Sequence, residues 1–532
     1  MRGTPGGGGI HLDTAPTRPL RWATSTGLGR WLGTIFIVVV VLTVLGQPAP
    51  WENEHVYMSL LKAAADPNYL VGDWTFGSGF LEKGVFNAVF SPAMQLLDIE
   101  ALSWIGRVIT WVVSARLLIA LGERLGSRVW TTVLSVSVLV AMGWSMGVGA
   151  AGVFGHFAAM AVATPLALGA FVVAMDRRIG WTALLVGLSA SFHPAVGLWF
   201  GGALIVALLI DQSTRMTMLK WLPVAVLASL PGLILEAMSV MSSSFDSQSS
   251  EFLALARIPH HVDPFAFGER GPLIFAGMVI AVVAMVRIRS NEYQVRLMGS
   301  ANAFLLLIAL AGIAARLLGF FDFLLIQPFR GLATLLPLTF FLMVSSVLPG
   351  FRTGALGRLW NEGRRGRTFI VATSATLLAI LLLWNPVLRW QTKATATMSA
   401  WTTDETDLDR ALVWLSQETE LDSVIVSPPW VDDIFYLSER PQFVSWEAVT
   451  YDRPVEWRER LELTTADPSV WNDSDEIHEE RLAEEYAALS LDHWVAVSER
   501  YDVDYVVTNA VYPVEPVYQQ GEWSVYSLAD AK

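Results

Sequence analysis

The sequence of 532 residues has no cysteine and few charged residues, and both shortages exclude whole classes of protein. Without cysteine, the chain has no disulfide framework, no thiol nucleophile and no thiolate metal site. The run of four glycines at 6–9 lacks the Lys-Ser or Lys-Thr ending of a phosphate-binding loop, which argues against a nucleotide-dependent mechanism. The net charge of −13 excludes a generally basic nucleic-acid binder.

Long uncharged stretches are abundant instead. Hydrophobic residues make up 53% of the chain and charged residues 16%, against about 25% in a soluble domain. Stretches of this kind are long enough to cross about 30 Å of hydrocarbon. We predict membrane spans at residues 31–45, 99–121, 129–149, 157–175, 218–240, 273–288, 298–318, 332–348 and 368–384.

The apolar stretch 181–210 is interrupted by His193-Pro194. Proline lacks an amide donor and disfavours helix at the residue before it. We therefore expect a pair of short, broken helices with His193 at its tip. Counting this pair as two gives about 11 spans.

The charges are divided unevenly along the chain. Residues 391–532 hold 30 Asp and Glu against 9 Lys and Arg, a balance of −21, whereas residues 1–390 have a balance of +8. The Arg-rich loops between the predicted spans all fall on one side, as the positive-inside rule requires. We predict a multi-pass protein of the cell membrane with a cytoplasmic N-terminus and an extracytoplasmic C-terminal domain. Only 5 of the 36 basic residues are Lys, and this acidic, Arg-rich composition resembles that of halophile proteins.

The predicted fold class is mainly α: a polytopic membrane helix bundle with a C-terminal external α/β domain. Residues 1–27 are expected to be disordered in the cytoplasm, residues 28–390 to form the transmembrane domain, and residues 391–532 to form the acidic external domain. External loops are expected at 47–98 and 241–272, the first with amphipathic helices lying at the membrane interface. In the tail, the sequence predicts helices at 404–418 and 476–488 and strands at 423–427, 505–508 and 523–528.

Ionisable residues gather at the external ends of the predicted spans, where they are costly unless they face a cavity or a partner. The candidate catalytic carboxylates are Glu52, Glu54 and Asp73. The candidate residues for binding substrate or a lipid phosphate are His55, Arg107, His156, His193, His260, His261, Arg316, Asp322 and Arg330.

A structural role stays open for each candidate. Arginines near span ends also reach the headgroups, a histidine before proline can cap a helix, and loop carboxylates can be simply solvated. The pattern His260-His261-x-Asp263 has no third histidine at helical spacing, so we predict no metal site.

In its architecture the chain resembles the GT-C superfamily of membrane glycosyltransferases, and nearly the whole chain is covered by this resemblance. The local patterns that resemble a little-characterised prokaryotic branch of it are Trp51-Glu-Asn-Glu-His55, Gly72-Asp-Trp74, Phe192-His-Pro194, Pro259-His-His-Val-Asp-Pro264 and Gln327-Pro-Phe-Arg330. The first external loop lacks the Asp-Asp, Asp-Glu or Glu-x-Asp pair of better-known members, and Glu52-x-Glu54 is the nearest match.

This resemblance implies an enzyme that moves a sugar from a polyprenyl-phosphate donor to a glycan or protein acceptor at the external membrane face. Its partners would be the lipid-linked donor, membrane lipids and the acceptor, without nucleic acid, and its cofactor would be none or a divalent cation. Glu52 or Glu54, with Asp73 as the next candidate, would deprotonate the acceptor, while Arg316 and Arg330 would hold the leaving phosphate.

Two alternatives stay open. A transporter or flippase of a lipid-linked or polyanionic substrate also uses broken helices near a polar site. A non-catalytic membrane protein of cell-surface assembly would use the tail to recruit partners.

Overall fold

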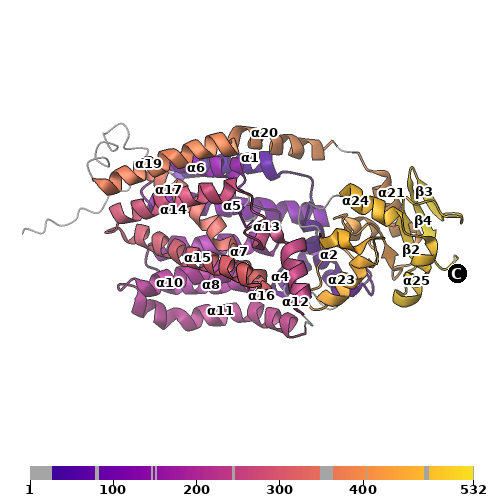
Figure 1. Ribbon diagram of the computed structural model, residues 1–532. Coiled ribbons are helices and arrows are strands. Elements are labelled where there is room, and N and C mark those ends of the chain that lie inside the picture. The colour runs from indigo at the N-terminus through magenta and orange to yellow at the C-terminus, as the bar shows by residue number, and fades with distance from the viewer. Residues whose placement is uncertain are drawn as a thin grey trace, which may run out of the picture.

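The computed structural model describes residues 27–77, 83–144, 146, 148–149, 152–242, 246–347, 363–402, 404–472 and 479–530. A bundle of long helices carries a smaller α/β domain at one end (Figure 1). The N-terminal segment that we expect to be disordered lies outside the described residues, apart from Gly27, which begins the first helix.

Within the described residues, seven helices are long and apolar enough to cross a membrane. They are α1 (Gly27–Leu45), α5 (Ile99–Arg124), α11 (Arg215–Ser242), α14 (Arg270–Ile288), α15 (Tyr293–Leu318), α17 (Arg330–Val347) and α19 (Arg364–Ala379), the last extended by the π-helical turn η6 (Ile380–Trp384). Helix α17 is central, because 83% of its apolar window is buried inside the protein, against 22% for α11.

Shorter apolar helices fill the rest of the bundle, so the length of the helices does not confirm the expected count of about 11 spans. They are α6 (Val129–Met142), α7 (Ala159–Met175), α8 (Ile179–Phe192) and the run of α9 (Pro194–Val196), η3 (Gly197–Gly201) and α10 (Gly202–Ile210). Helix α6 ends seven residues before the predicted end of its span, because Gly143 adopts a left-handed conformation with φ +70°. The predicted break at His193-Pro194 is confirmed.

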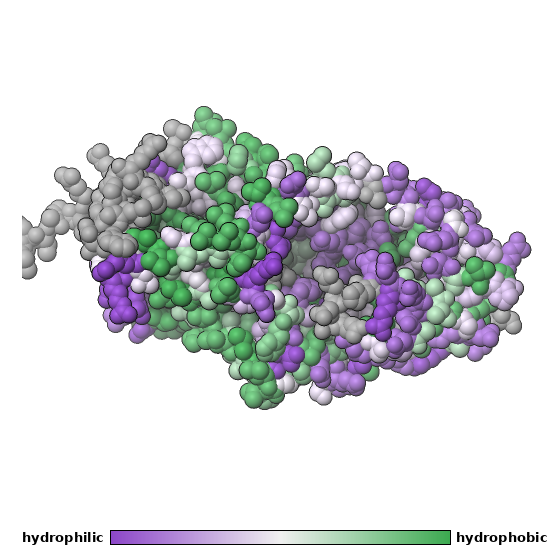
Figure 2. Space-filling view, turned by 45° about the horizontal axis from the view of Figure 1, so that its top comes forward, coloured by the Kyte–Doolittle hydropathy of each residue, from purple (hydrophilic) through white to green (hydrophobic). Residues whose placement is uncertain are grey.

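Apolar side chains cover the outside of the bundle, whereas the C-terminal domain is largely polar (Figure 2). On α15 and η6, Leu307, Leu381 and Leu382 are more than 60% exposed. In a soluble protein such surfaces would be an aggregation hazard, and in a membrane they face lipid.

The C-terminal domain is built on a four-stranded sheet of order β1-β2-β4-β3. Its strands are β1 (Ile425–Val426), β2 (Tyr505–Thr508), β3 (Tyr518–Gln520) and β4 (Trp523–Ser527). Only β1 and β2 run parallel, with Val426 beside Val506. Its helices are α21 (Asp407–Glu418), α22 (Ile434–Ser438), α23 (Pro454–Glu462), η7 (Pro468–Asn472), α24 (Glu479–Ala487) and α25 (Leu491–Tyr501). Helix α20 (Pro386–Ala400) connects the bundle to this domain and packs on α1 and α6.

The predicted elements of the tail are present; β2 has the predicted bounds and the others are shorter. Strand β1 occupies two of the five residues expected at 423–427, and α21 begins at Asp407, where Thr406 provides a capping box. The helix expected at 476–488 is α24, whose predicted first residues lie outside the described part of the chain.

Two segments between bundle helices, predicted from the sequence as external loops and called here the first and second external segments, complete the core of the C-terminal domain. The first contains α2 (Glu54–Ala65), α3 (Trp74–Gly77), α4 (Gly84–Phe90) and η2 (Ser91–Gln95). The second contains α12 (Ser247–Phe252), η4 (Leu253–Arg257) and α13 (Pro259–Val262). A short helix, α16 (Phe321–Leu325), lies in the turn between α15 and α17.

From its amphipathic pattern, we expected α2 to lie at the membrane interface. In the structure, protein covers both of its apolar faces instead. Val56 and Leu60 pack into a cluster with Leu412, Ile434 and other residues of the C-terminal domain. The opposite face of α2 packs against the bundle through Met58 and Leu61. The helix is therefore buried on both faces between the two parts of the molecule.

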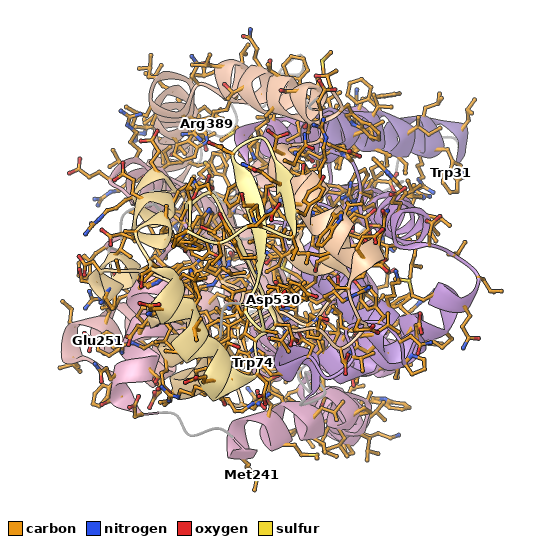
Figure 3. All side chains as sticks on the ribbon, turned by 90° about the vertical axis from the view of Figure 1, so that its right-hand side faces the viewer. Trp31, Trp74, Met241, Glu251, Arg389 and Asp530 are labelled. Carbon is orange, nitrogen blue, oxygen red and sulfur yellow. The ribbon has the colours of Figure 1, made fainter. Side chains whose placement is uncertain are left out.

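In the same way, Phe252 and Leu253 enter the core formed by the tryptophans of the C-terminal domain. Trp74 of the first segment lies under the same domain, near the centre of the bundle end in Figure 3, whereas Met241 lies at its edge. Arg453 and Arg460 hold the Trp74 indole, with guanidinium carbons 4.9 and 4.0 Å from the ring centroid.

The ends of α5 define the two ends of the bundle. At its start, Glu100 accepts a hydrogen bond from Tyr436 of the C-terminal domain (2.7 Å). At its other end, Glu123 pairs with Arg30 and Arg124 pairs with Asp176. Helix α5 has 26 residues and is therefore about 39 Å long. Arg30 and Asp176 consequently lie at the end of the bundle away from the C-terminal domain.

Candidate functional site

Several of the candidate residues lie close together, at the junction between the bundle and the C-terminal domain. At the centre is a fully buried pair, Glu54 at the start of α2 and Arg107 in α5. Arg107 donates to both carboxylate oxygens of Glu54, through Nε (3.1 Å to Oε1) and through Nη2 to Oε2. Its Nη1 donates to the carbonyl oxygen of Gln47 (2.7 Å), and its guanidinium lies 4.9 Å from the Trp104 ring centroid.

Glu54 also accepts two backbone hydrogen bonds, from Phe157 (2.7 Å) and Trp51 (3.1 Å). Phe157 can approach α5 this closely because residue 106 is glycine, where an added Cβ would lie 2.2 Å from the Phe157 ring. All four acceptor sites of the carboxylate are thus occupied. Glu54 and Arg107, which the sequence suggested as a base and a phosphate ligand, therefore use these hydrogen-bonding groups on one another and on the nearby backbone.

Glu52 and His156 lie next to this pair and are reachable from outside. Oε2 of Glu52 is 3.7 Å from Nδ1 of His156. Burial, and then the charge of Arg107, lower the pKa of His156 to about 3, so the imidazole is neutral at physiological pH. Desolvation by the surrounding protein and repulsion by Glu447 raise the pKa of Glu52, which makes its carboxylate a stronger base.

A second group surrounds the start of α17. Arg330 bonds to Oε1 of Gln327, while its buried Nε has no hydrogen-bond partner among the described residues. His193, His260 and His261 all lie within electrostatic reach of Arg330. The broken helix pair is tied to this place by Trp199, whose indole N–H donates to the carbonyl oxygen of Ile326 (2.7 Å).

The histidines of this group have structural contacts too. Nδ1 of His193 accepts the N–H of Val196 (3.4 Å), which is the capping role that stayed open from the sequence. The rings of His260 and His261 have centroids 4.2 Å apart, and burial lowers the pKa of both. They are therefore neutral hydrogen-bonding groups beside one permanent cation.

The C-terminal domain adds two carboxylates that sequence reasoning missed, Asp432 and Glu447. Glu447 pairs with Arg257 of η4 (2.9 Å), whose Nε also donates to the carbonyl oxygen of Trp446 (2.8 Å). Burial, followed by the charges of Glu447 and Glu52, raises the pKa of Asp432 to about 7. Glu447 lies within electrostatic reach of Glu52 and His260 as well, so it connects the two groups.

Another missed residue is Lys393 of α20. It lies within electrostatic reach of Glu52, and burial lowers its pKa. The rarity of lysine could have pointed to Lys393 from the sequence, because the chain has only five lysines.

Four candidates from the sequence are placed differently. Asp73 is buried and accepts the N–H groups of Thr75 (2.8 Å), Phe76 (2.9 Å) and Gln442 (2.8 Å), so it fastens the first external segment to the C-terminal domain. Although these bonds favour its charge, burial prevails and raises the pKa of Asp73 to about 6.

His55 is buried beside Tyr436, with ring centroids 5.8 Å apart, and burial lowers its pKa to about 4. Arg316 pairs with Asp263 (Nε to Oδ1, 3.2 Å). Asp322 is exposed in α16. In the described part of the chain, none of these three side chains contacts the side chain of Glu52 or Arg330.

A divalent cation does not fit the side chains that the structure describes. Glu52 and His156 form one pair of ligand type at the junction and His260 and His261 form another, and no group of three His, Asp or Glu side chains is close enough to hold an ion in the described ranges. Without a third ligand no step can be assigned to a metal. What remains is the carboxylate of Glu52, with a raised pKa, beside the neutral His156, and the buried Arg330 near His193, His260 and His261.

Comparisons with known proteins give a small match by sequence and a broad one by structure. The model of a domain of unknown function (DUF6798) matches residues 406–464, and no curated protein matches.

The oligosaccharyltransferase of Archaeoglobus fulgidus is similar in structure. Its apo form has a TM-score of 0.48 and 11% identity, over 90% of this chain and 69% of that chain. The same enzyme, AglB, in complex with an inhibitory peptide and a dolichol-phosphate has a TM-score of 0.47 and 11% identity, over 91% and 70%. At this identity the likeness identifies no functional residue of the present chain.

Proposed function

We propose that this chain is a membrane glycosyltransferase that moves a sugar from a polyprenyl-phosphate donor to an acceptor at the external membrane face. One observation carries the proposal. A carboxylate of raised pKa, Glu52, and a buried arginine, Arg330, whose Nε has no hydrogen-bond partner among the described residues, occupy the junction where an apolar bundle meets a polar domain. A lipid-linked substrate needs such a boundary, because its chain is apolar and its sugar is polar.

The chemistry requires few groups. The acceptor hydroxyl or amide attacks the anomeric carbon of the sugar while the bond from that carbon to the phosphate oxygen breaks. The proton of the acceptor passes to a carboxylate, for which we propose Glu52, and the electron pair leaves with the lipid phosphate. Arg330 is proposed to hold that phosphate through charge-assisted hydrogen bonds, with His193, His260 and His261 as neutral donors.

The orientation of the chain is part of this proposal. Helices α6, α7 and α8 and the run α9 to α10 are proposed to cross with the seven longer helices, which makes eleven spans. The N-terminus is proposed to lie in the cytoplasm and the C-terminal domain outside the cell membrane. Support comes from the Arg-rich ends of α1 and α5, which lie at the end of the bundle away from the C-terminal domain.

The test is transfer of a labelled sugar from a polyprenyl-phosphate donor in membranes that contain the full chain. Removing a general base costs about 10²–10⁴-fold in rate, so Glu52→Gln should lose that much while donor binding stays intact. Arg330→Ala should weaken donor binding instead. Glu269→Gln, at an exposed position before α14, is the matched control. A wild-type rate for Glu52→Gln would overturn the assignment of the base, and no transfer by the wild type with any such donor would overturn the function.

A further inference from the structure

A single buried carboxylate connects three segments that are distant in the sequence. Glu54 belongs to α2, Arg107 lies 53 residues further along in α5, and Phe157 precedes α7. Through Arg107, the carbonyl oxygen of Gln47 is tied to the same point. The connections after α1 and before α7 are therefore fixed to α5 by one ion pair.

Glu52 and His156, which lie next to this pair, are chain neighbours of residues that this carboxylate holds. Glu52 follows Trp51, whose N–H donates to Glu54, and adopts φ +50°. Positive φ is uncommon outside glycine, so the turn needs support from its surroundings. The backbone N–H of Trp51 and the side chain of Glu54 bracket this turn.

His156 is held in a similar way from the other side. The residue after it, Phe157, donates its N–H to Glu54, and the residue before it, Gly155, accepts the indole N–H of Trp111 of α5 (2.8 Å). The distance of 3.7 Å between the side chains of Glu52 and His156 therefore depends on contacts made by their neighbours.

Glu54 is unsuited to take a proton from a substrate. It is fully buried, and its oxygens accept four hydrogen bonds, two of them from a guanidinium. Protonation would leave Arg107 as an uncompensated buried charge, which is strongly unfavourable. The carboxylate is therefore retained as an anion that organises donors around it.

We infer that Glu54 and Arg107 are positioning residues: the buried pair holds Glu52 and His156 against one another, and Glu52 alone carries the reactive carboxylate. The consequence for the reaction rests on the proposed function, whereas the positioning itself does not. A fork that donates two bonds to one carboxylate cannot be replaced by an ammonium group, so Arg107→Lys should loosen the arrangement although it keeps the charge.

The absence of cysteine from the chain permits a test that does not require activity. Glu52→Cys and His156→Cys in the full chain, in membranes, would supply its only two thiols, and a short bifunctional thiol reagent would join them. We expect high cross-linking yield in this background and a several-fold lower yield when Glu54→Gln or Arg107→Lys is added. The matched control is Arg124→Lys, which alters a bidentate pair with Asp176 at the other end of the same helix and should leave the yield unchanged.

Kinetics of the chain with its native Glu52 give the second test. Misplacement of a reacting group by about 1 Å can cost about 10²-fold in rate. Glu54→Gln and Arg107→Lys should each lower kcat by about that factor, with the donor KM unchanged. The double variant should lose little more than either single variant, because both remove the same interaction.

The pH profile separates positioning from direct proton transfer. The residual activity of Glu54→Gln should keep the acid limb that reports a titrating carboxylate, and Glu52→Gln should abolish that limb. Loss of the limb in Glu54→Gln, a raised donor KM in Arg107→Lys, or unaltered cross-linking in both variants would each overturn the inference. Altered cross-linking in a chain that transfers no sugar would retain the positioning and overturn the proposed function.

Discussion

The helical bundle and the C-terminal domain are stabilised in opposite ways. The bundle exposes large apolar side chains and buries the Arg107–Glu54 ion pair. The C-terminal domain has a balance of −21 over residues 391–532, and its polar surface is visible in Figure 2. A surface that lipid requires and a surface that water requires thus meet at one boundary, and the candidate site lies there.

The two regions nevertheless share hydrophobic cores, because residues of the external segments complete the C-terminal domain. Val56, Leu60 and Phe76 enter one of its clusters, and Phe252 and Leu253 enter another. The polarity of the surface changes near residue 391, whereas the hydrophobic cores include residues from both sides of this position. The predictions below test which of these two divisions governs stability.

The largest effect is expected from cutting the chain at the polarity boundary. A fragment of residues 391–532 lacks the apolar side chains that the external segments contribute, so it should not fold cooperatively by itself. Circular dichroism and thermal melting of the fragment would check this. A sharp, reversible transition would show that packing follows the polarity boundary after all.

A single core substitution on the far side of that boundary should destabilise the C-terminal domain. Phe252→Ala removes a buried ring 6.0 Å from that of Trp457, and buried Phe→Ala changes cost about 3–5 kcal/mol. Limited proteolysis of the full chain should cut the C-terminal domain sooner, with the bundle left intact. Val511→Ala, at a site that is 90% exposed, is the control and should leave the digestion rate unchanged.

A pH effect of smaller size is expected from Asp432. Because its pKa is raised to about 7 in the folded protein, the folded state binds more protons than the unfolded state between about pH 4 and pH 7. Its destabilising effect therefore grows as the pH rises through that window and is constant above it. Asp432→Asn should raise the stability at pH 8 by about 2 kcal/mol, since partial solvation reduces the effect, and by much less at pH 4. An equal gain in melting temperature at both pH values would contradict the assignment.

The smallest effect should come from salt. Dense like charge destabilises a compact state unless counterions screen it. As salt rises from millimolar to molar, proteolysis of the C-terminal domain in the full chain should slow by an amount that corresponds to less than about 1 kcal/mol. The cleavage rate of a bundle loop serves as the internal reference. Faster cleavage of the C-terminal domain at high salt would exclude salt adaptation.

Much of the fold could be predicted because its physical signals are local. Uncharged stretches predicted the seven long apolar helices, Pro194 predicted the break at His193, and the strand predicted at Tyr505–Thr508 is β2. The early end of α6 could not be predicted, since a glycine inside an apolar stretch does not reveal whether its φ will be positive. The role of α2 was missed because an amphipathic pattern does not say which apolar surface will cover it.

For the candidate site, the sequence identified residues but not their partners. Glu54 and Arg107 were both candidates, yet nothing local indicates that residues 53 positions apart neutralise each other. Asp432 and Glu447 were missed because they are 2 of 30 acidic residues in an acid-rich tail, where composition offers no contrast. Their significance comes from Arg257 of the second external segment, which pairs with Glu447 and lies within electrostatic reach of Asp432.

The shared core also has a consequence for synthesis of the chain. Val56, Leu60 and Phe76 are made early, but partners such as Val507 and Val525 follow some 450 residues later. At about 5–20 residues per second, these apolar side chains wait roughly 20–90 s for the surface that buries them. During that interval the nascent chain would need a holding factor on the side where the first external segment emerges.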